Sequence, residues 1–390
     1  MTRALTLLAA SALACAAPFA LAQSAATRPA AAPDDTVEAY LERLGMNRLI
    51  AEQLSDRLRT AEGDQRKALA ERLGRHYVVL LTDASTAAER AVWEHRGRRL
   101  LEDVPEADTG ELRLNIAKAS YVRVEEVVER GRLRLAEPAE VQEAERQLRA
   151  LEPEFMSIAR RAGARVDELE RAENAGNSSD ELATAIGDAR RLRSLAFYYA
   201  GWCQYYLALL TRAEAPAVEA MKSFGWLLNS AGGRIASVDR LPTDLLRYEH
   251  IARAAIGAAL SASLRGNDVE AIRWLDAVAD ADGLPDVIRE QMLVRRMIVL
   301  GQARRWADLE QLVRRARRGE KLHGFGGGPN THEPRPLPVT AARFLAILTL
   351  EADRAVAPQQ IEALARTALG DLVADQEIPQ VLDLVRRYGT

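Results

Sequence analysis

The sequence predicts an all-α fold, an α-α superhelix or solenoid of antiparallel helix hairpins. Three observations support this fold class. The helix formers Ala, Leu, Arg and Glu dominate the 390 residues, whereas aromatic residues make up only 5%. From Thr36 onward, apolar residues recur every three or four positions and almost no segment alternates as a strand does. One helix-hairpin pattern also recurs along the chain.

Composition excludes several classes of protein. With 48% hydrophobic and 28% charged residues, the chain can bury a substantial core and is not disordered throughout. A formal net charge of −3 favours neither nucleic acid nor a strongly anionic membrane as partner. No segment after the N-terminus is apolar for the length that a transmembrane helix requires.

The N-terminus has the layout of a secretory signal peptide, residues 1–22. Arg3 precedes a short apolar run, and Ala20-Leu21-Ala22 supplies a cleavage site before Gln23. The predicted location is therefore the periplasm or cell envelope, or outside the cell. Residues 23–35 are rich in Ala and Pro and predict a flexible linker.

Cys15 offers an alternative to simple cleavage. Bacterial lipoproteins carry a cysteine at the cleavage point, preceded by leucine and two small residues. Here Leu13 stands one position too close to Cys15, so cleavage before Gln23 is the preferred interpretation and a lipid anchor at Cys15 the alternative.

An N-terminal helical region is predicted for residues 36–173. Its apolar stripes at helical spacing cover residues 37–44, 69–81, 88–100, 112–128 and 141–169. Pro153 interrupts the last stripe and is expected to kink or divide that helix. The turn cluster at residues 174–180 is expected to end the region.

The next helix, residues 182–210, is apolar around much of its circumference and is expected to be central. Its residues Trp202, Tyr205 and Tyr206 are predicted to be structural, and Cys203 is predicted to be a small buried side chain rather than a nucleophile. Three more helices are predicted in the C-terminal region 339–390, at residues 341–350, 361–372 and 381–388.

Residues 253–285 carry the clearest hairpin pattern. The pattern begins with small residues in a first helix, Ala258, Ala259 and Ala262, and continues with a turn at Arg265, Gly266 and Asn267. It ends with Ala271 and Leu275 in a second helix and with Pro285. This window resembles one tetratricopeptide repeat, although the aromatic positions of the family's first helix are mostly alanine here. The resemblance extends over residues 180–318 and implies stacked hairpins that bind a peptide or partner protein.

Two weaker copies accompany this window. The apolar positions Val269, Ile272 and Leu275 recur 37 residues later (306 − 269 = 37) as Trp306, Leu309 and Leu312. An earlier copy with longer helices is suggested by Ala200, Gly201, Tyr205, Ala220 and Phe224.

No catalytic, cofactor-binding or metal-binding residue is predicted. The histidines lack the spacing of a metal motif, and His323 and His332 only share a loop. That loop, residues 319–338, is rich in Gly and Pro but lacks the lysine and the strand-to-helix context of a phosphate-binding loop. It is interpreted as a solvated connection, with a lid or partner-binding loop as the alternative.

A local cluster of basic residues marks the predicted partner contact: Arg304, Arg305, Arg314, Arg315, Arg318 and Lys321. Such a cluster attracts acidic partners, and the alternative is an ordinary solvated helix face.

The predicted function is that of an exported, non-enzymatic scaffold that binds a protein or peptide. The alternatives are a small-ligand-binding protein or enzyme whose pocket is covered by residues 319–338, and a lipid-anchored envelope assembly factor.

Overall fold

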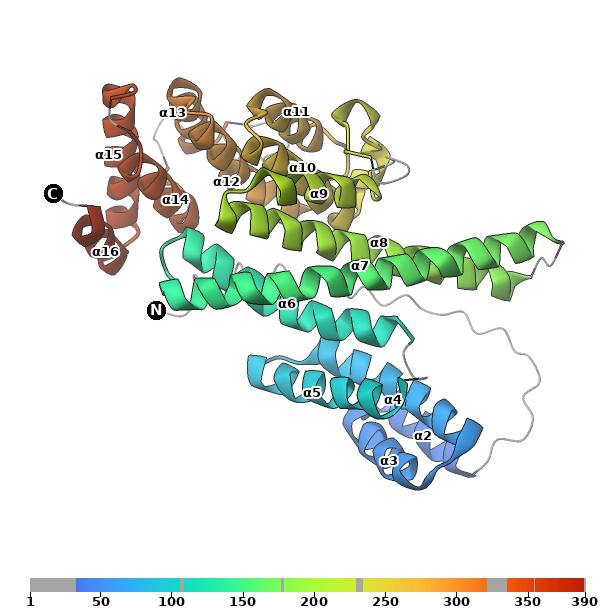
Figure 1. The fold of residues 1–390 in the computed structure, drawn as a ribbon. Helices are drawn as coiled ribbons and strands as arrows, with labels where there is room; N and C mark the ends of the chain where they lie inside the picture. The colour runs from blue at the N-terminus through green and yellow to red at the C-terminus, as the bar shows by residue number, and fades with distance from the viewer. Residues whose placement is uncertain are drawn as a thin grey trace. The chain divides into compact units, whose positions relative to one another are not determined.

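The computed structural model describes residues 33–105, 109–176, 179–228, 234–320, 335–353 and 355–388. Within these ranges it contains α-helices, two short 3-10 helices and no strand (Figure 1). The prediction of an all-α fold is confirmed. The expected signal peptide lies outside the described residues, as does the expected linker up to residue 32, and Pro33 already begins helix α2.

Fifteen α-helices occupy the described ranges. They are α2 (Pro33–Arg43), α3 (Asn47–Thr60), α4 (Gly63–Asp83), α5 (Ala87–Asp103), α6 (Glu111–Arg132), α7 (Pro138–Asn174), α8 (Asp180–Thr211), α9 (Glu214–Gly225), α10 (Glu249–Leu264), α11 (Asp268–Ala279), α12 (Asp286–Gln302), α13 (Trp306–Arg317), α14 (Val339–Leu350), α15 (Pro358–Ala374) and α16 (Ile378–Tyr388). The 3-10 helices are η3 (Val238–Arg240) and η4 (Thr243–Arg247). The three helices expected after residue 339 are α14, α15 and α16.

The described residues divide into two compact units, and the divisions do not coincide with the regions expected from sequence. One unit comprises residues 127–149 and everything from residue 200 onward, and the other comprises the described residues up to 126 together with 150–199. Helices α6, α7 and α8 contribute to both units.

The unit containing α2 to α5 has a core of its own. Helices α3 and α4 pack together, as do α4 and α5. Leu54, Leu73, Trp93 and Leu112 are among its buried side chains. A second set of apolar contacts joins α7 and α8, where the ring of Phe155 stacks on that of Tyr199 at 5.3 Å between centroids.

Helix α7 runs unbroken from Pro138 to Asn174 with Pro153 inside it. Of the two expected effects of Pro153, a kink or a division of the helix, the division is wrong. A buried apolar stripe explains why the helix continues, because Leu148, Leu151 and Phe155 on either side of the proline are all buried. Their burial outweighs the about 3 kcal/mol that an interior proline costs a helix.

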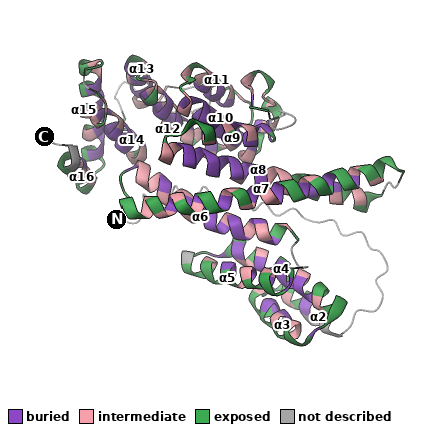
Figure 2. Ribbon diagram, viewed as in Figure 1, coloured by how far each residue is buried: buried purple, intermediate pink, exposed green. Residues whose placement is uncertain are grey.

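The other unit is a succession of packed helices. Helix α9 packs on α10, α10 on α11, α11 on α12, α12 on α13 and α14 on α15. Helix α10 is rich in Ala and is buried along most of its length (Figure 2). Cys203 is fully buried in α8 and lies between Trp202 and Tyr205, which are buried too. This confirms the predicted burial of Cys203.

Two turns in this unit, after α10 and after α12, have the same geometry. After α10, Gly266 adopts a φ of +74° and the Asn267 N–H donates to the carbonyl of Ala262 at 3.0 Å. After α12, Arg304 adopts a φ of +55° and the Arg305 N–H donates to the carbonyl of Leu300 at 2.9 Å. Both are the left-handed turn that commonly ends a helix.

The turns are 38 residues apart (304 − 266 = 38), one more than the offset expected from sequence. Burial agrees with 38, because Val269 is 71% exposed whereas its expected equivalent Trp306 is 5% exposed. One residue corresponds to a rotation of about 100° on a helix, so the offset of 37 matched an exposed position to a buried one.

Glycines permit a close approach around Phe224. The ring of this α9 residue lies between Gly201 of α8 and Gly257 of α10. A Cβ atom added to Gly201 would lie 2.7 Å from the ring, and one added to Gly257 would lie closer still. Glycine is therefore required at both positions, and these two residues set the spacing of three helices.

We expect Gly257→Ala to destabilise the chain by about 1–3 kcal/mol, because the new methyl group overpacks against Phe224. In the double variant with Phe224→Leu the loss should be smaller than the sum of the single losses. Gly370→Ala is the control, since nothing lies within 4 Å of its added Cβ and alanine favours helix. Urea unfolding of the two single variants, the double variant and the control gives their free energies of unfolding. Strictly additive losses in the double variant would contradict the packing account.

Arg304→Gly should stabilise the chain by about 1 kcal/mol, because a left-handed conformation strains every residue with a Cβ atom. The reciprocal change Gly266→Ala should destabilise it by a similar amount. Thermal unfolding of both variants tests this prediction. Shifts of the Tm with the same sign would show that the two turns are not equivalent.

Candidate functional site

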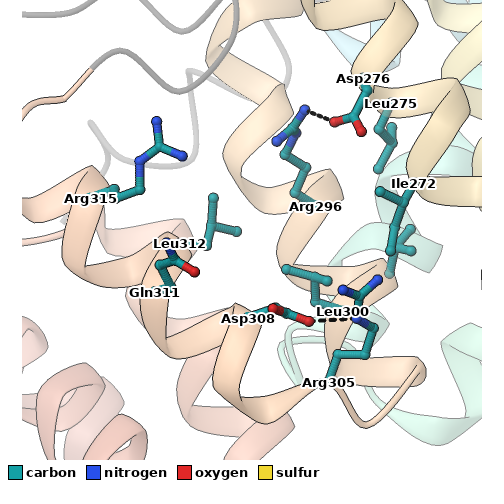
Figure 3. Close-up of a pocket in the computed structure, with 11 residues that line it drawn as sticks. Ile272, Leu275, Asp276, Arg296, Leu300, Arg305, Asp308, Gln311, Leu312 and Arg315 are labelled. Carbon is teal, nitrogen blue, oxygen red and sulfur yellow. Dashed lines mark hydrogen bonds and ion pairs between the residues drawn. The ribbon is translucent and has the colours of Figure 1, made fainter. Parts of the chain in front are cut away.

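A cavity of about 230 Å³ lies between helices α11, α12 and α13 (Figure 3). Its walls come from all three helices and from the turn before α13. The lining residues are Ile272, Leu275, Asp276, Arg296, Val299, Leu300, Arg305, Asp308, Gln311, Leu312 and Arg315. We call this cavity the α11–α13 pocket.

The floor of the α11–α13 pocket is apolar because the amphipathic stripes of these helices converge there. Leu275, Val299 and Leu312 are buried, and Ile272 and Leu300 are partly exposed. Each helix turns its core-facing stripe inward, so these side chains expose only their edges to the pocket. An apolar group of a ligand would contact this floor.

Ion pairs surround the floor. Arg296 of α12 is paired with Asp276 of α11, and the Nε of Arg305 donates to Asp308 at 2.5 Å (Figure 3). The Nε of Arg315 donates to Glu320, just outside the pocket, at 3.1 Å.

The Nε of Arg296 is buried and has no hydrogen-bond partner among the described residues. A buried donor without a partner is unfavourable by about 1–3 kcal/mol. Three arginines against two aspartates also leave the lining with a net charge of +1. The charge of the lining therefore favours an anionic group.

The pocket contains only part of the predicted contact cluster. Arg305 and Arg315 line it, whereas Arg304 occupies the strained turn before α13. Arg314 pairs with Glu310 on an exposed helix face, and Arg318 donates to Glu320 at 2.5 Å. Lys321 lies outside the described residues.

Sequence reasoning missed Arg296 and Asp276. They stand 20 residues apart on different helices, and the contact between α11 and α12 brings them together. No sequence spacing signals this pair, because it depends on the contact between two different helices.

The predicted loop 319–338 is described only at its ends, because residues 321–334 lie outside the described ranges. Both ends are held by hydrogen bonds. The Arg335 N–H donates to the carbonyl of Arg317 at 2.8 Å, and the Leu337 N–H donates to Asp371 at 3.0 Å. Burial raises the pKa of Asp371, although the hydrogen bond from the Leu337 N–H and the charge of Arg317 oppose the rise.

A buried charge network lies apart from the pocket in the same unit. Glu129 of α6 accepts a hydrogen bond from Tyr206 of α8 at 2.9 Å and forms ion pairs with Arg132 at 3.2 Å and Arg295 of α12 at 3.4 Å. Burial alone would raise the pKa of Glu129, but the two arginines and Tyr206 outweigh it and lower the pKa to about 2. Glu129 therefore stays ionised near neutral pH.

The ionised Glu129 carboxylate is shared by three donors, so the network joins helices α6, α8 and α12. Burial also raises the pKa of the neighbouring Tyr205, which keeps its hydroxyl protonated.

In the part of the chain that the structure describes, no helix is long and apolar enough to cross a membrane. Comparison with protein-family models, with curated proteins and with solved structures found no match. The site is therefore interpreted from its own residues.

Glu129→Gln should destabilise the chain by about 3–5 kcal/mol at pH 7, because it leaves two buried arginines without their counter-charge. A depressed carboxyl pKa stabilises the fold above the unfolded value, near 4.5, and that contribution disappears as the pH falls toward 2. The difference between wild type and variant should therefore shrink in urea titrations repeated below pH 4.5.

Glu126→Gln changes an exposed carboxyl of the same helix and serves as the control. Tyr206→Phe, a milder change, should lose about 1–3 kcal/mol. A Glu129→Gln variant as stable as the Glu126→Gln control would contradict a structural role of the network.

Proposed function

We propose that this chain is a non-enzymatic helical-repeat scaffold that binds a peptide or protein partner at the α11–α13 pocket. The observation that carries the proposal is the combination of an apolar floor with a ring of arginine–aspartate pairs whose net charge is positive. Such a surface suits an apolar side chain flanked by a carboxylate.

The size of the pocket favours side chains over a whole cofactor. Small-molecule sites enclose about 300–1,000 Å³, whereas this cavity measures about 230 Å³. It accommodates one or two side chains of a partner whose backbone stays outside.

The tetratricopeptide-like stacking is part of the same proposal. It is supported by the succession of packed helices from α9 to α15 and by the equivalent turns after α10 and α12. In a stacked array, grooves between neighbouring hairpins are the natural place for an extended partner.

Export to the periplasm or cell envelope is proposed from residues 1–22 alone. A lipid-anchored assembly factor is the corresponding alternative through Cys15. Mass spectrometry of the mature N-terminus separates them, since Gln23 as the first residue supports simple secretion and a modified Cys15 supports anchoring.

Selection of a random peptide library on the purified chain tests the binding proposal. We expect enrichment of peptides in which an acidic residue adjoins one or two apolar residues. For a selected peptide, Arg305→Glu and Arg315→Glu should each raise the Kd at least about tenfold, because each reverses a charge at the pocket. Fluorescence anisotropy provides the Kd values.

Arg366→Glu is the matched control, since Arg366 is a highly exposed α15 arginine that also pairs with a glutamate, Glu362. Its Kd should equal that of the wild type. A selection without acidic peptides, or equal Kd values in all four chains, would refute the pocket as the binding site. A small molecule that occupies the pocket and displaces no peptide would favour the alternative of a ligand-binding protein or enzyme.

A further inference from the structure

Two glutamates and a histidine converge in the unit that contains α2 to α5, far along the chain from the α11–α13 pocket. Glu38 and Glu42 are four residues apart on α2 and so lie on the same face of that helix. His76 comes from α4. One ligand atom from each of the three side chains lies within 4.8 Å of the others.

The histidine is held by its other ring nitrogen. Nδ1 of His76 lies 3.1 Å from Oδ1 of Asn47, the first residue of α3. An amide oxygen only accepts hydrogen bonds, so Nδ1 carries the proton and donates it. In the neutral ring, Nε2 then presents a lone pair.

That lone pair faces two carboxylates. Nε2 of His76 lies 3.7 Å from Oε1 of Glu42 and 3.8 Å from Oε1 of Glu38, distances too long for a hydrogen bond. The side chains of His76 and Glu38 are each only 9% exposed, so water does not surround them. Three electron-rich atoms thus converge on one point with no proton between them.

The neutral form of the histidine agrees with its surroundings. Burial lowers the pKa of His76, and the charge of Arg75 acts in the same direction, while Glu42 and Glu38 oppose them with a smaller effect.

We propose that Glu38, Glu42 and His76 bind a divalent transition-metal ion, for which zinc is the best match. Imidazole and carboxylate donors are those that Zn²⁺ takes at about 2.0–2.2 Å, and a tetrahedral site of that size separates its ligand atoms by about 3.3–3.4 Å. The two distances to Nε2, 3.7 and 3.8 Å, need to contract by a few tenths of an ångström, and the two carboxylate oxygens, which lie within 4.8 Å of each other, must close to the same separation.

The surrounding groups match this role. The Nδ1–H bond to Asn47 fixes the orientation of the ring, as such partners of metal-bound histidines do. Arg72 donates to both oxygens of Glu38 and orients that carboxylate. Glu42 is 53% exposed, so the cluster is open to solvent on the side of this carboxylate.

Calorimetric titration of the chelator-treated chain with ZnCl₂ tests the proposal. We expect a binding event of one equivalent that raises the Tm and that disappears in His76→Ala. The matched control is His95→Ala, which removes an exposed histidine from α5 in the same unit and should bind zinc as the wild type does. Asn47→Ala, which frees the ring, should weaken binding about tenfold or more.

Because His76 is buried, its loss also affects folding, and Glu42→Gln provides the second variant. It removes a half-exposed ligand, should keep the circular dichroism spectrum and should weaken zinc binding at least about tenfold. With Co²⁺ as probe, the visible absorption of a tetrahedral site should appear in the wild type and be lost in Glu42→Gln. Absence of zinc binding in the wild type, or an unchanged Kd in both His76→Ala and Glu42→Gln, would overturn the proposal.

Discussion

The charge network around Glu129 is the constraint on which the unit containing the α11–α13 pocket most depends. It ties α6, α8 and α12 together through one carboxylate that three donors share. A buried charge tolerates little displacement, because each lost contact leaves an ion without compensation in a medium that solvates it poorly. The network therefore specifies how α12 is placed, and α12 forms one wall of the pocket.

Packing places the remaining helices. Phe224 fits between two glycines, which fixes the spacing of α8, α9 and α10, and the Ala-rich α10 lets its neighbours approach closely. Helices α11 and α13 then follow from equivalent turns after α10 and α12. The pocket exists because α11, α12 and α13 meet with small gaps between their apolar stripes. The paired charges lie at the edges of these stripes.

Much of the fold could be predicted from sequence, because helical periodicity reports burial directly. The stripe from Leu148 to Leu169 is buried as expected, and Cys203 lies in the core. Errors arose where context outweighs local preference. Pro153 does not divide α7, because the buried residues around it hold the helix together. The expected offset of 37 residues between the two windows was one residue too small, because it was taken from apolar positions in the sequence rather than from the geometry of the turns.

The candidate sites were less predictable. Arg305 and Arg315 were identified as part of a basic cluster, but charge alone did not separate them from Arg314 and Arg318, which pair on exposed faces away from the cavity. Arg296 was missed because its partner belongs to another helix. The Glu38, Glu42 and His76 cluster joins residues up to 38 positions apart (76 − 38 = 38) and follows no spacing rule, so only the packing of α2, α3 and α4 shows it.

Site-specific photo-crosslinking in cells tests most directly whether the α11–α13 pocket is where a partner binds. A photoreactive amino acid at Gln311, which lines the pocket, should yield a discrete crosslinked species. The same group at Gln359, exposed on α15, should yield none. Discrete species at Gln311 alone are the predicted result. No species at Gln311, or the same species at both positions, would contradict the account.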